Sequence, residues 1–256
     1  MFNSAIFLFS ATLNIVPSIH YISKDFNLWH YRLGHLSDER LHALRTQYPF
    51  ISFEKIHLCD IYNRAIQKKL PFTLSTSKTT VVFDFIHMDI WGPCSINSMQ
   101  GFKYCLTVVD DFSRYTCTFL LHAKSEVRQK IVSFIAYIEN HFHTTAKIIR
   151  MDNGSEFSMK DFFSSKGIIH QTTCIETPKQ NGIVERKHQQ LLNITRALIF
   201  QAHLPSLFWD FAVQHATYLI NCTPTPTPLL QNIAPYVKLH DKPCDISNLR
   251  VFGCLC

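Results

Sequence analysis

The chain has 256 residues, of which 46% are hydrophobic and 17% are charged. This composition excludes an intrinsically disordered chain, and the length allows one medium-sized domain with a smaller module beside it. The 25 Lys and Arg residues exceed the 19 Asp and Glu residues, and the resulting net charge of +6 suits a polyanionic partner, although many unrelated proteins are equally basic.

The nine cysteines are scattered from Cys59 to Cys256, without the dense and regular spacing of a disulfide-stabilised secreted domain. This pattern predicts a reducing compartment. Near the N-terminus, residues 6–9 form a hydrophobic run, but no basic residue precedes it and polar residues interrupt it well short of a membrane span. We therefore expect no membrane partner.

β-Strand patterns begin near residue 81. Residues 81–90, 103–109 and 114–121 are rich in β-branched and aromatic side chains, and short turns separate them. Because the connections are short, these three segments are expected to form the antiparallel start of a sheet.

A helix and further strands follow. Ser125 is a candidate N-cap for a helix whose hydrophobic residues recur at helical spacing. These residues are Val127, Ile131, Phe134, Ile135 and Ile138. Residues 147–151 then predict a buried strand, and residues 167–170 predict a last one. A strand, helix and strand crossover after three antiparallel strands predicts a mixed sheet.

The Pro- and Gly-containing segment 177–182 leads into a long helix. One apolar stripe of this helix is formed by Val184, Leu191, Ile194 and Leu198. Glu185 lies in its first turn, beside the stripe rather than opposite it, so it is able to face the sheet. A further helix around residues 208–219 precedes an extended Thr-Pro repeat at 223–228.

Three carboxylates lie where elements end or begin. Asp89 lies in the first strand, Asp152 precedes the turn-forming Asn153-Gly154 pair, and Glu185 begins the long helix. A compact fold can bring them to one edge, and carboxylate oxygens are the ligands that Mg²⁺ prefers. The trio indicates a divalent-metal site for phosphodiester chemistry. Taken singly, however, such acids are more often helix caps or solvated charges.

Several phrases of the sequence resemble one protein family, in that family's order. They occupy residues 28–35, 110–115, 152–154, 180–182 with 185–187, and 251–254. Together they resemble the integrase portion of a copia-type long-terminal-repeat retrotransposon Pol polyprotein, within the retroviral integrase superfamily. The resemblance covers about residues 28–256. It implies an α/β fold: a ribonuclease H-like core with a mixed five-stranded sheet flanked by helices, preceded by a small helical HHCC-type module.

The resemblance also implies a domain organisation. An N-terminal extension (1–23) precedes a pre-integrase zinc-binding-like module (24–72), a linker (73–80), the integrase catalytic core (81–222), and a Pro-rich linker with a truncated C-terminal extension (223–256). We interpret the N-terminal extension, in order of preference, as a misassigned start, a remnant of upstream polyprotein or a short signal. The spacing from Asp152 to Glu185 is shorter than is usual in the family, which predicts a shortened surface helix or loop near residues 158–165.

In the family, the small module binds zinc through two His followed by two Cys. His30 and His35 match the first pair and Cys59 matches the third ligand, but Tyr62 occupies the fourth position. A phenol is a poor substitute for a thiolate, so the resemblance implies at most a degenerate Zn²⁺ site completed by water or a neighbour. The alternative is that both histidines are only packed or hydrogen-bonded.

For the core, the resemblance implies that Asp89, Asp152 and Glu185 hold two Mg²⁺ or Mn²⁺ ions. This site would process the 3′ ends of the element's DNA and transfer them to target DNA, with no nucleotide cofactor, and no phosphate-binding P-loop is present. Double-stranded DNA is the expected partner. The expected DNA contacts are Lys179, Gln180, Asn181, Arg186, Lys187, Arg64, Lys68 and Lys69.

Active integrases of this superfamily are multimeric, so a homo-oligomer is implied, located in the nucleus after a stage in a cytoplasmic particle. Two other hypotheses stay open at this point. The chain is either an inert, truncated retroelement remnant that only binds nucleic acid, or a domesticated scaffold. The three acids favour the enzyme, whereas Tyr62 favours the remnant.

Overall fold

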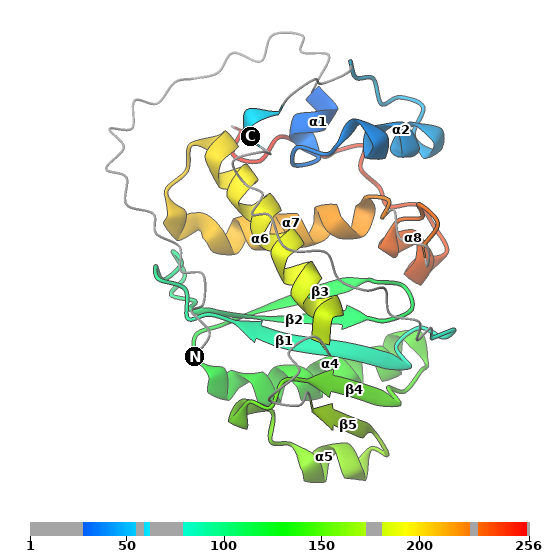
Figure 1. Ribbon diagram of the computed structural model, residues 1–256, viewed down its shortest axis with the longest axis vertical. Coiled ribbons are helices and arrows are strands. Elements are labelled where there is room, and N and C mark those ends of the chain that lie inside the picture. Colours follow the sequence, from blue (N-terminus) through cyan, green and yellow to red (C-terminus); the bar gives the residue numbers. More distant parts are fainter. Residues whose placement is uncertain (1–27, 55–58, 62–78, 173–180, 226–229, 255–256) are drawn as a thin grey trace.

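A five-stranded mixed sheet lies at the centre of the structure, a computed structural model that describes residues 28–54, 59–61, 79–172, 181–225 and 230–254. The strand order is β3-β2-β1-β4-β5 (Figure 1). The strands are β1 (Phe85–Trp91), β2 (Tyr104–Asp110), β3 (Thr116–Leu121), β4 (Ile148–Met151) and β5 (Ile169–Thr172). β1, β2 and β3 pair antiparallel, whereas β4 pairs parallel with β1 and β5. The predicted mixed sheet is confirmed.

Helices cover both faces of this sheet and extend beyond it (Figure 1). The helices are α1 (Leu28–Arg32), α2 (Asp38–Gln47), α4 (Val127–Phe142), α5 (Lys160–Ser165), α6 (Gly182–Ala202), α7 (Trp209–Cys222) and α8 (Pro235–His240). The six-residue α5 agrees with the short helix predicted near residues 158–165. In the described part of the chain, every helix is too short or too polar to cross a lipid bilayer.

Three of the element boundaries that differ from the sequence predictions have local causes. The first strand begins at Phe85 rather than at 81, because Phe83 has a left-handed backbone (φ 61°) that interrupts extended structure. Ser125 is not the N-cap of α4. It lies inside a 3-10 turn, η1 (Lys124–Glu126), and α4 begins after Glu126. The last strand starts at Ile169 because Gly167 (φ 67°) still belongs to the turn that ends α5.

Alternate residues of β1 face opposite sides of the sheet, as strand geometry requires. Ile86 and Met88 pack in one core with the buried face of α4. That face consists of the predicted Val127, Ile131, Phe134, Ile135 and Ile138. The intervening residues, His87 and Asp89 among them, therefore face the other side, where α6 and α7 lie. The alternation decides which acids can meet α6.

The N-terminal module shares a second hydrophobic core with α6 and α7. Trp29, Leu33 and Leu44 of the module are buried in one cluster with Leu191, Leu198 and the apolar face of α7. Gly34 lies close to α7, since a Cβ atom there would lie 2.9 Å from Cδ1 of Leu219. Module and sheet domain are therefore packed as one body, and Figure 1 shows α6 running from the sheet to the module.

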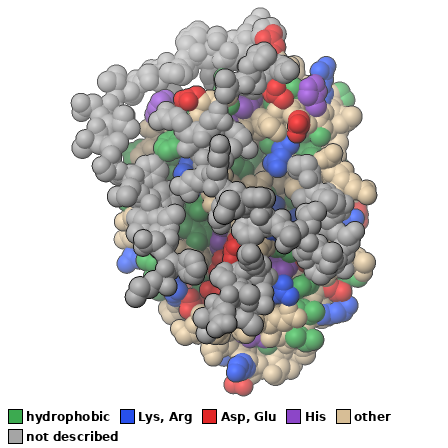
Figure 2. Space-filling model, in the orientation of Figure 1, with side chains coloured by type: hydrophobic (Ala, Val, Ile, Leu, Met, Phe, Trp, Pro, Cys, Tyr) green, Lys and Arg blue, Asp and Glu red, His purple; other side chains and the backbone are tan. Residues whose placement is uncertain are grey.

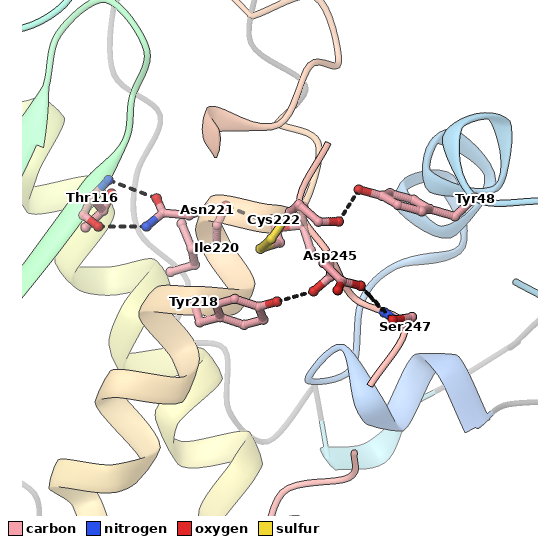
Figure 3. Close-up of a disulfide and its surroundings, with 10 residues drawn as sticks. Tyr48, Thr116, Tyr218, Ile220, Asn221, Cys222, Asp245 and Ser247 are labelled. Carbon is pink, nitrogen blue, oxygen red and sulfur yellow. Dashed lines mark hydrogen bonds between the residues drawn. A yellow bond between two sulfur atoms is a disulfide. The ribbon is translucent and has the colours of Figure 1, made fainter. Parts of the chain in front are cut away.

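A disulfide joins Cys222, at the end of α7, to Cys244 in the C-terminal segment. The scattered cysteine pattern did not predict this pair. Figure 3 shows two tyrosines fixing the same segment: the hydroxyl of Tyr48 donates to the carbonyl of Cys244 (2.5 Å), and that of Tyr218 donates to the carbonyl of Asp245 (2.6 Å). Because Tyr48 follows α2, the C-terminal segment ties the module to α7.

The Asp110-Asp111 pair, at the end of β2, serves the structure of the core rather than the candidate metal site. Asp110 accepts hydrogen bonds from the backbone nitrogens of Phe83 and Ser113, both at 2.8 Å. Asp111 is buried, and its Oδ1 lies 3.0 Å from Nε2 of His87 and 3.1 Å from a guanidinium nitrogen of Arg114. Burial alone would raise the pKa of Asp111, but the His87 hydrogen bond and the Arg114 charge lower it to about 2.

We expect Asp111→Asn to lower the free energy of unfolding by about 2 kcal/mol at neutral pH, because the folded state holds this pKa at about 2 instead of 3.8. A depressed carboxyl pKa stabilises the fold above pH 4, and the contribution disappears as pH falls from about 4 to 2. Urea denaturation of the original protein and of Asp111→Asn, repeated from pH 7 downward, should therefore show their free energies of unfolding converging as the pH falls. Asp241→Asn, at an exposed left-handed position that asparagine tolerates, is the control. A constant difference at all pH values would contradict the ionic explanation.

Candidate functional site

Asp89 lies in β1, and Asp152 directly follows the adjacent parallel strand β4. In the β1–β4 register His87 pairs with Arg150, and two residues further along the chain lead from this pair to Asp89 and to Asp152. Both side chains are half-buried, on the face of the sheet opposite α4. Burial, and next the charge of Asp89, raise the pKa of Asp152, whereas the Gly154 amide, 3.4 Å from Oδ1, lowers it. The fold thus brings two mutually repelling carboxylates together.

Helix α6 delivers the third acid to the same side of the sheet. Its N-terminus is held on β1 by Asn181, whose side-chain nitrogen donates to the carbonyl of Met88 (3.1 Å). Glu185 is half-buried in the first turn of α6. One turn later, His188 places Nδ1 3.2 Å from Oδ2 of Asp89. Acidic, basic and histidine side chains lie together near the middle of this face in Figure 2.

The three acids do not form one tight cluster. Among the described His, Cys, Asp and Glu residues, the only group of three or more whose ligand atoms all lie within 4.8 Å of one another is His30, His35 and Cys59. The structure therefore pairs Asp89 with Asp152 and places Glu185 nearby on α6, without bringing all three to common ligand distance.

The module's histidines and cysteine converge because of a tight turn. Gly34 (φ 70°) and His35 (φ 62°) are both left-handed, and they turn the chain back so that Nδ1 of His35 lies 3.2 Å from Nε2 of His30 and 3.1 Å from Sγ of Cys59. The remaining ring nitrogens are held by hydrogen bonds to Leu36 and Gln201. Nδ1 of His30 donates to the Leu36 carbonyl (2.8 Å), and Nε2 of His35 donates to Oε1 of Gln201 (2.8 Å).

These hydrogen bonds fix the tautomers so that the unprotonated nitrogens of His30 and His35 face each other. Two lone pairs at 3.2 Å repel unless a cation lies between them. Burial, and then the neighbouring His30, lower the pKa of His35 to about 4, which favours the neutral ring that metal binding requires. Two imidazoles and a thiol suit Zn²⁺. Tyr62, the mismatch at the fourth position, lies outside the described residues.

The predicted DNA contacts differ in their surroundings. Arg186 is exposed on α6. Lys187 is only 6% exposed, and burial, with smaller contributions from the charges of Arg40 and Arg114, lowers its pKa to about 7. Asn181 is buried, and its side-chain nitrogen donates a hydrogen bond to the carbonyl of Met88. The other five predicted contacts, Lys179, Gln180, Arg64, Lys68 and Lys69, lie outside the described residues.

Two neighbours of the candidate sites were not assigned their roles from sequence. Neither His188 nor Gln201 was singled out in the sequence analysis. His188 lies three residues after Glu185, so helical spacing alone could have predicted that the two share a face. Gln201 is 166 residues from His35, and no local pattern predicts that contact.

Comparison with known families divides the chain into two regions. The integrase core domain family matches residues 81–178, and the GAG-pre-integrase domain family matches residues 6–67. The core match includes both Asp89 and Asp152, and the pre-integrase match includes the His30, His35 and Cys59 group.

Two plant proteins are similar over most of the chain. The Retrovirus-related Pol polyprotein from transposon RE2 of Arabidopsis thaliana is 36% identical over 232 residues, covering 89% of this chain. The corresponding polyprotein from transposon TNT 1-94 of Nicotiana tabacum is 36% identical over 234 residues, also covering 89% of this chain. The chain spans only 16% and 17% of the length of these two relatives.

A solved structure shows the same fold. A chain of the simian T-cell lymphotropic virus intasome, determined in complex with the PP2A regulatory subunit B56 gamma, superposes with a TM-score of 0.52 at 21% identity. The match covers 69% of this chain and 60% of that one. The mixed sheet with helices on both faces is therefore a ribonuclease H-like fold of the kind found in integrase cores.

Proposed function

Because this chain belongs to the integrase region of copia-type retrotransposon Pol polyproteins, we propose that it is a metal-dependent polynucleotidyl transferase acting on double-stranded DNA. It would trim the 3′ ends of the element's DNA and join them to target DNA. Each joining step exchanges one phosphodiester for another, so no nucleotide is consumed.

The donor set at the sheet edge fits hard divalent cations. Asp89 already disfavours ionisation of Asp152, and a divalent cation held by these residues would relieve that repulsion. Bound Mg²⁺ or Mn²⁺ would supply Lewis acidity, which favours ionisation of an attacking hydroxyl and neutralises charge on the phosphate. Asp89 and Asp152 would hold the ions, and Glu185 would add its carboxylate from α6.

Other residues of the chain would position the DNA. The exposed Arg186 follows Glu185 directly and can donate charge-assisted hydrogen bonds to a phosphate beside the acids. Lys179 and Gln180 precede α6 and would continue this contact, and Arg64, Lys68 and Lys69 would add a second one from the module. Lys187 and Asn181 would act from within the fold, since both are buried.

The small module would have a structural role. Zn²⁺ held by His30, His35 and Cys59 would fix the Gly34 turn that packs against α6 and α7. We further propose that the protein works as a homo-oligomer in the nucleus, after a stage in a cytoplasmic particle. The proposed domain limits are those of the sequence analysis.

The observation that carries the proposal is the pairing of Asp89, in β1, with Asp152, just after the adjacent parallel strand β4, beneath the helix that bears Glu185. Two neighbouring carboxylates at a sheet edge repel each other and lower the stability of the fold. A site that processes phosphodiesters explains why both are present. An active enzyme and a remnant that has kept the fold would both contain this pairing.

A DNA-joining assay distinguishes them. The purified chain is incubated with a labelled duplex that carries a recessed 3′ hydroxyl, a supercoiled target plasmid, and Mg²⁺, Mn²⁺ or EDTA. We expect joined product with either ion and none with EDTA. DNA binding is measured in parallel by fluorescence anisotropy. Tight binding without joined product in either ion would make the chain a remnant that only holds nucleic acid.

A further inference from the structure

His188 contacts the candidate metal site from outside the acid trio. Its Nδ1 lies 3.2 Å from Oδ2 of Asp89, and the residue is 8% exposed. A histidine that faced DNA would be open to solvent before DNA arrived. The ring is instead enclosed against a carboxylate, so its contact with Asp89 is part of the folded chain itself.

Both oxygens of Asp89 are engaged. Oδ1 accepts the backbone N–H of Ile90 at 2.9 Å, and Oδ2 faces Nδ1 of His188. A carboxylate held at both oxygens cannot rotate freely about its Cβ–Cγ bond. Each oxygen has a second lone pair, so both remain able to bind a cation in this fixed orientation.

The same histidine ties the carboxylate to the position of α6. Asn181 holds the start of the helix on Met88, and His188, two turns later, holds Asp89, the next residue of β1. Glu185 lies between the two contacts. The orientation of Asp89 and the placement of Glu185 therefore depend on one docking arrangement.

Packing alone does not explain a histidine at this position. Its Nε2 is buried, and the described residues provide no hydrogen-bond partner for it. A buried polar atom without a partner disfavours the folded state, so an aliphatic side chain would serve a purely structural role better. The Nδ1 contact to Asp89 is the only contact of this ring in the described part of the chain that an aliphatic residue would lose.

We propose that His188 is a positioning residue, which holds the Asp89 carboxylate in the orientation that a divalent cation requires. This inference rests on the proposed function, which identifies the site as one that binds divalent cations. It concerns cation binding rather than turnover, because groups that orient metal ligands typically change metal affinity about 10–100-fold when they are removed.

A titration of the full chain with Mn²⁺ in the absence of DNA tests this role. Electron paramagnetic resonance measures the concentration of free Mn²⁺ and therefore gives the affinity of the chain for the ion. We expect His188→Leu to weaken Mn²⁺ binding by about 10-fold or more. His188→Asn should stay close to the original protein, because its amide nitrogen can reach the place of Nδ1, whereas His188→Gln puts its amide near the place of Nε2 and should resemble leucine. His215→Leu removes another histidine with a buried, unpartnered Nε2 and is the matched control.

Equal Mn²⁺ affinity in the original protein and His188→Leu would overturn the proposal. If the leucine variant does not fold, the asparagine and glutamine variants decide, and equal affinity in those two overturns it as well. Failure of the proposed function has a different result: the original protein binds Mn²⁺ with His188-dependent affinity but joins no DNA.

Discussion

Asp152→Asn should abolish DNA joining while raising the melting temperature of the metal-free chain. We expect joining to fall by at least about 100- to 1,000-fold, the loss typical when a group that stabilises transition-state charge is removed. The fold raises the pKa of Asp152 through burial and the charge of Asp89. Since a raised carboxyl pKa means that the ionised form is disfavoured in the folded state, the neutral amide should stabilise the chain at neutral pH.

The two readouts are the joining assay and thermal denaturation in EDTA. Asp161→Asn, an exposed aspartate in the first turn of α5, is the control and should change neither. Added Mg²⁺ should raise the melting temperature of the original protein more than that of Asp152→Asn. Lost joining together with a lowered melting temperature would show that Asp152 supports the fold rather than the chemistry.

Cys59→Ala should remove zinc from the N-terminal module. We expect zinc affinity to fall by about 100-fold or more, because even groups behind the ligands of a zinc site contribute about 10–100-fold. Zinc at 1,000 times its Kd stabilises a protein by about 4 kcal/mol, so the original chain should also lose stability in a chelator. Zinc content after purification and chelator competition measure both effects.

Cys94→Ser is the matched control, since Cys94 is a half-buried free cysteine outside the histidine-cysteine group. It should keep one zinc ion per chain. A zinc-free original protein, purified with zinc present, would mean that Tyr62 has cost the site its function and that His30 and His35 are packed without metal. Equal zinc content in Cys59→Ala and the original protein would place the metal elsewhere.

The periodic parts of the fold were predictable from the sequence. The stripe of α4 from Val127 to Ile138 follows helical spacing and is buried as expected. In α6, Val184, Leu191 and Leu198 are buried as predicted, whereas Ile194 is only partly buried. The predicted strand boundaries were wrong where a single residue interrupts the extended backbone. Phe83 is such a residue, and its backbone nitrogen donates a hydrogen bond to Asp110, a contact that no local pattern predicts. Local patterns identify elements but not the contacts that end them.

In the candidate site, too, some contacts were predictable from the sequence and others were not. Asp89 and Asp152 were predictable as neighbours only through the resemblance to the integrase fold, because α4 connects β3 to β4, whereas β4 pairs with β1. The contact of His188 with Asp89 was not, because it depends on how α6 lies along β1. The Cys222–Cys244 disulfide was missed for a similar reason, since nine scattered cysteines give no indication of pairing.

The core shared by the N-terminal module with α6 and α7 bears on proteolytic processing. A cut between residues 61 and 79 would break the peptide chain but not the packing of Trp29, Leu33 and Leu44 against the helices, nor the hydrogen bond from Tyr48 to the C-terminal segment. The two pieces should elute together from a sizing column and separate only in denaturant. A fragment starting at residue 81, made on its own, would leave this apolar surface bare and prone to self-association.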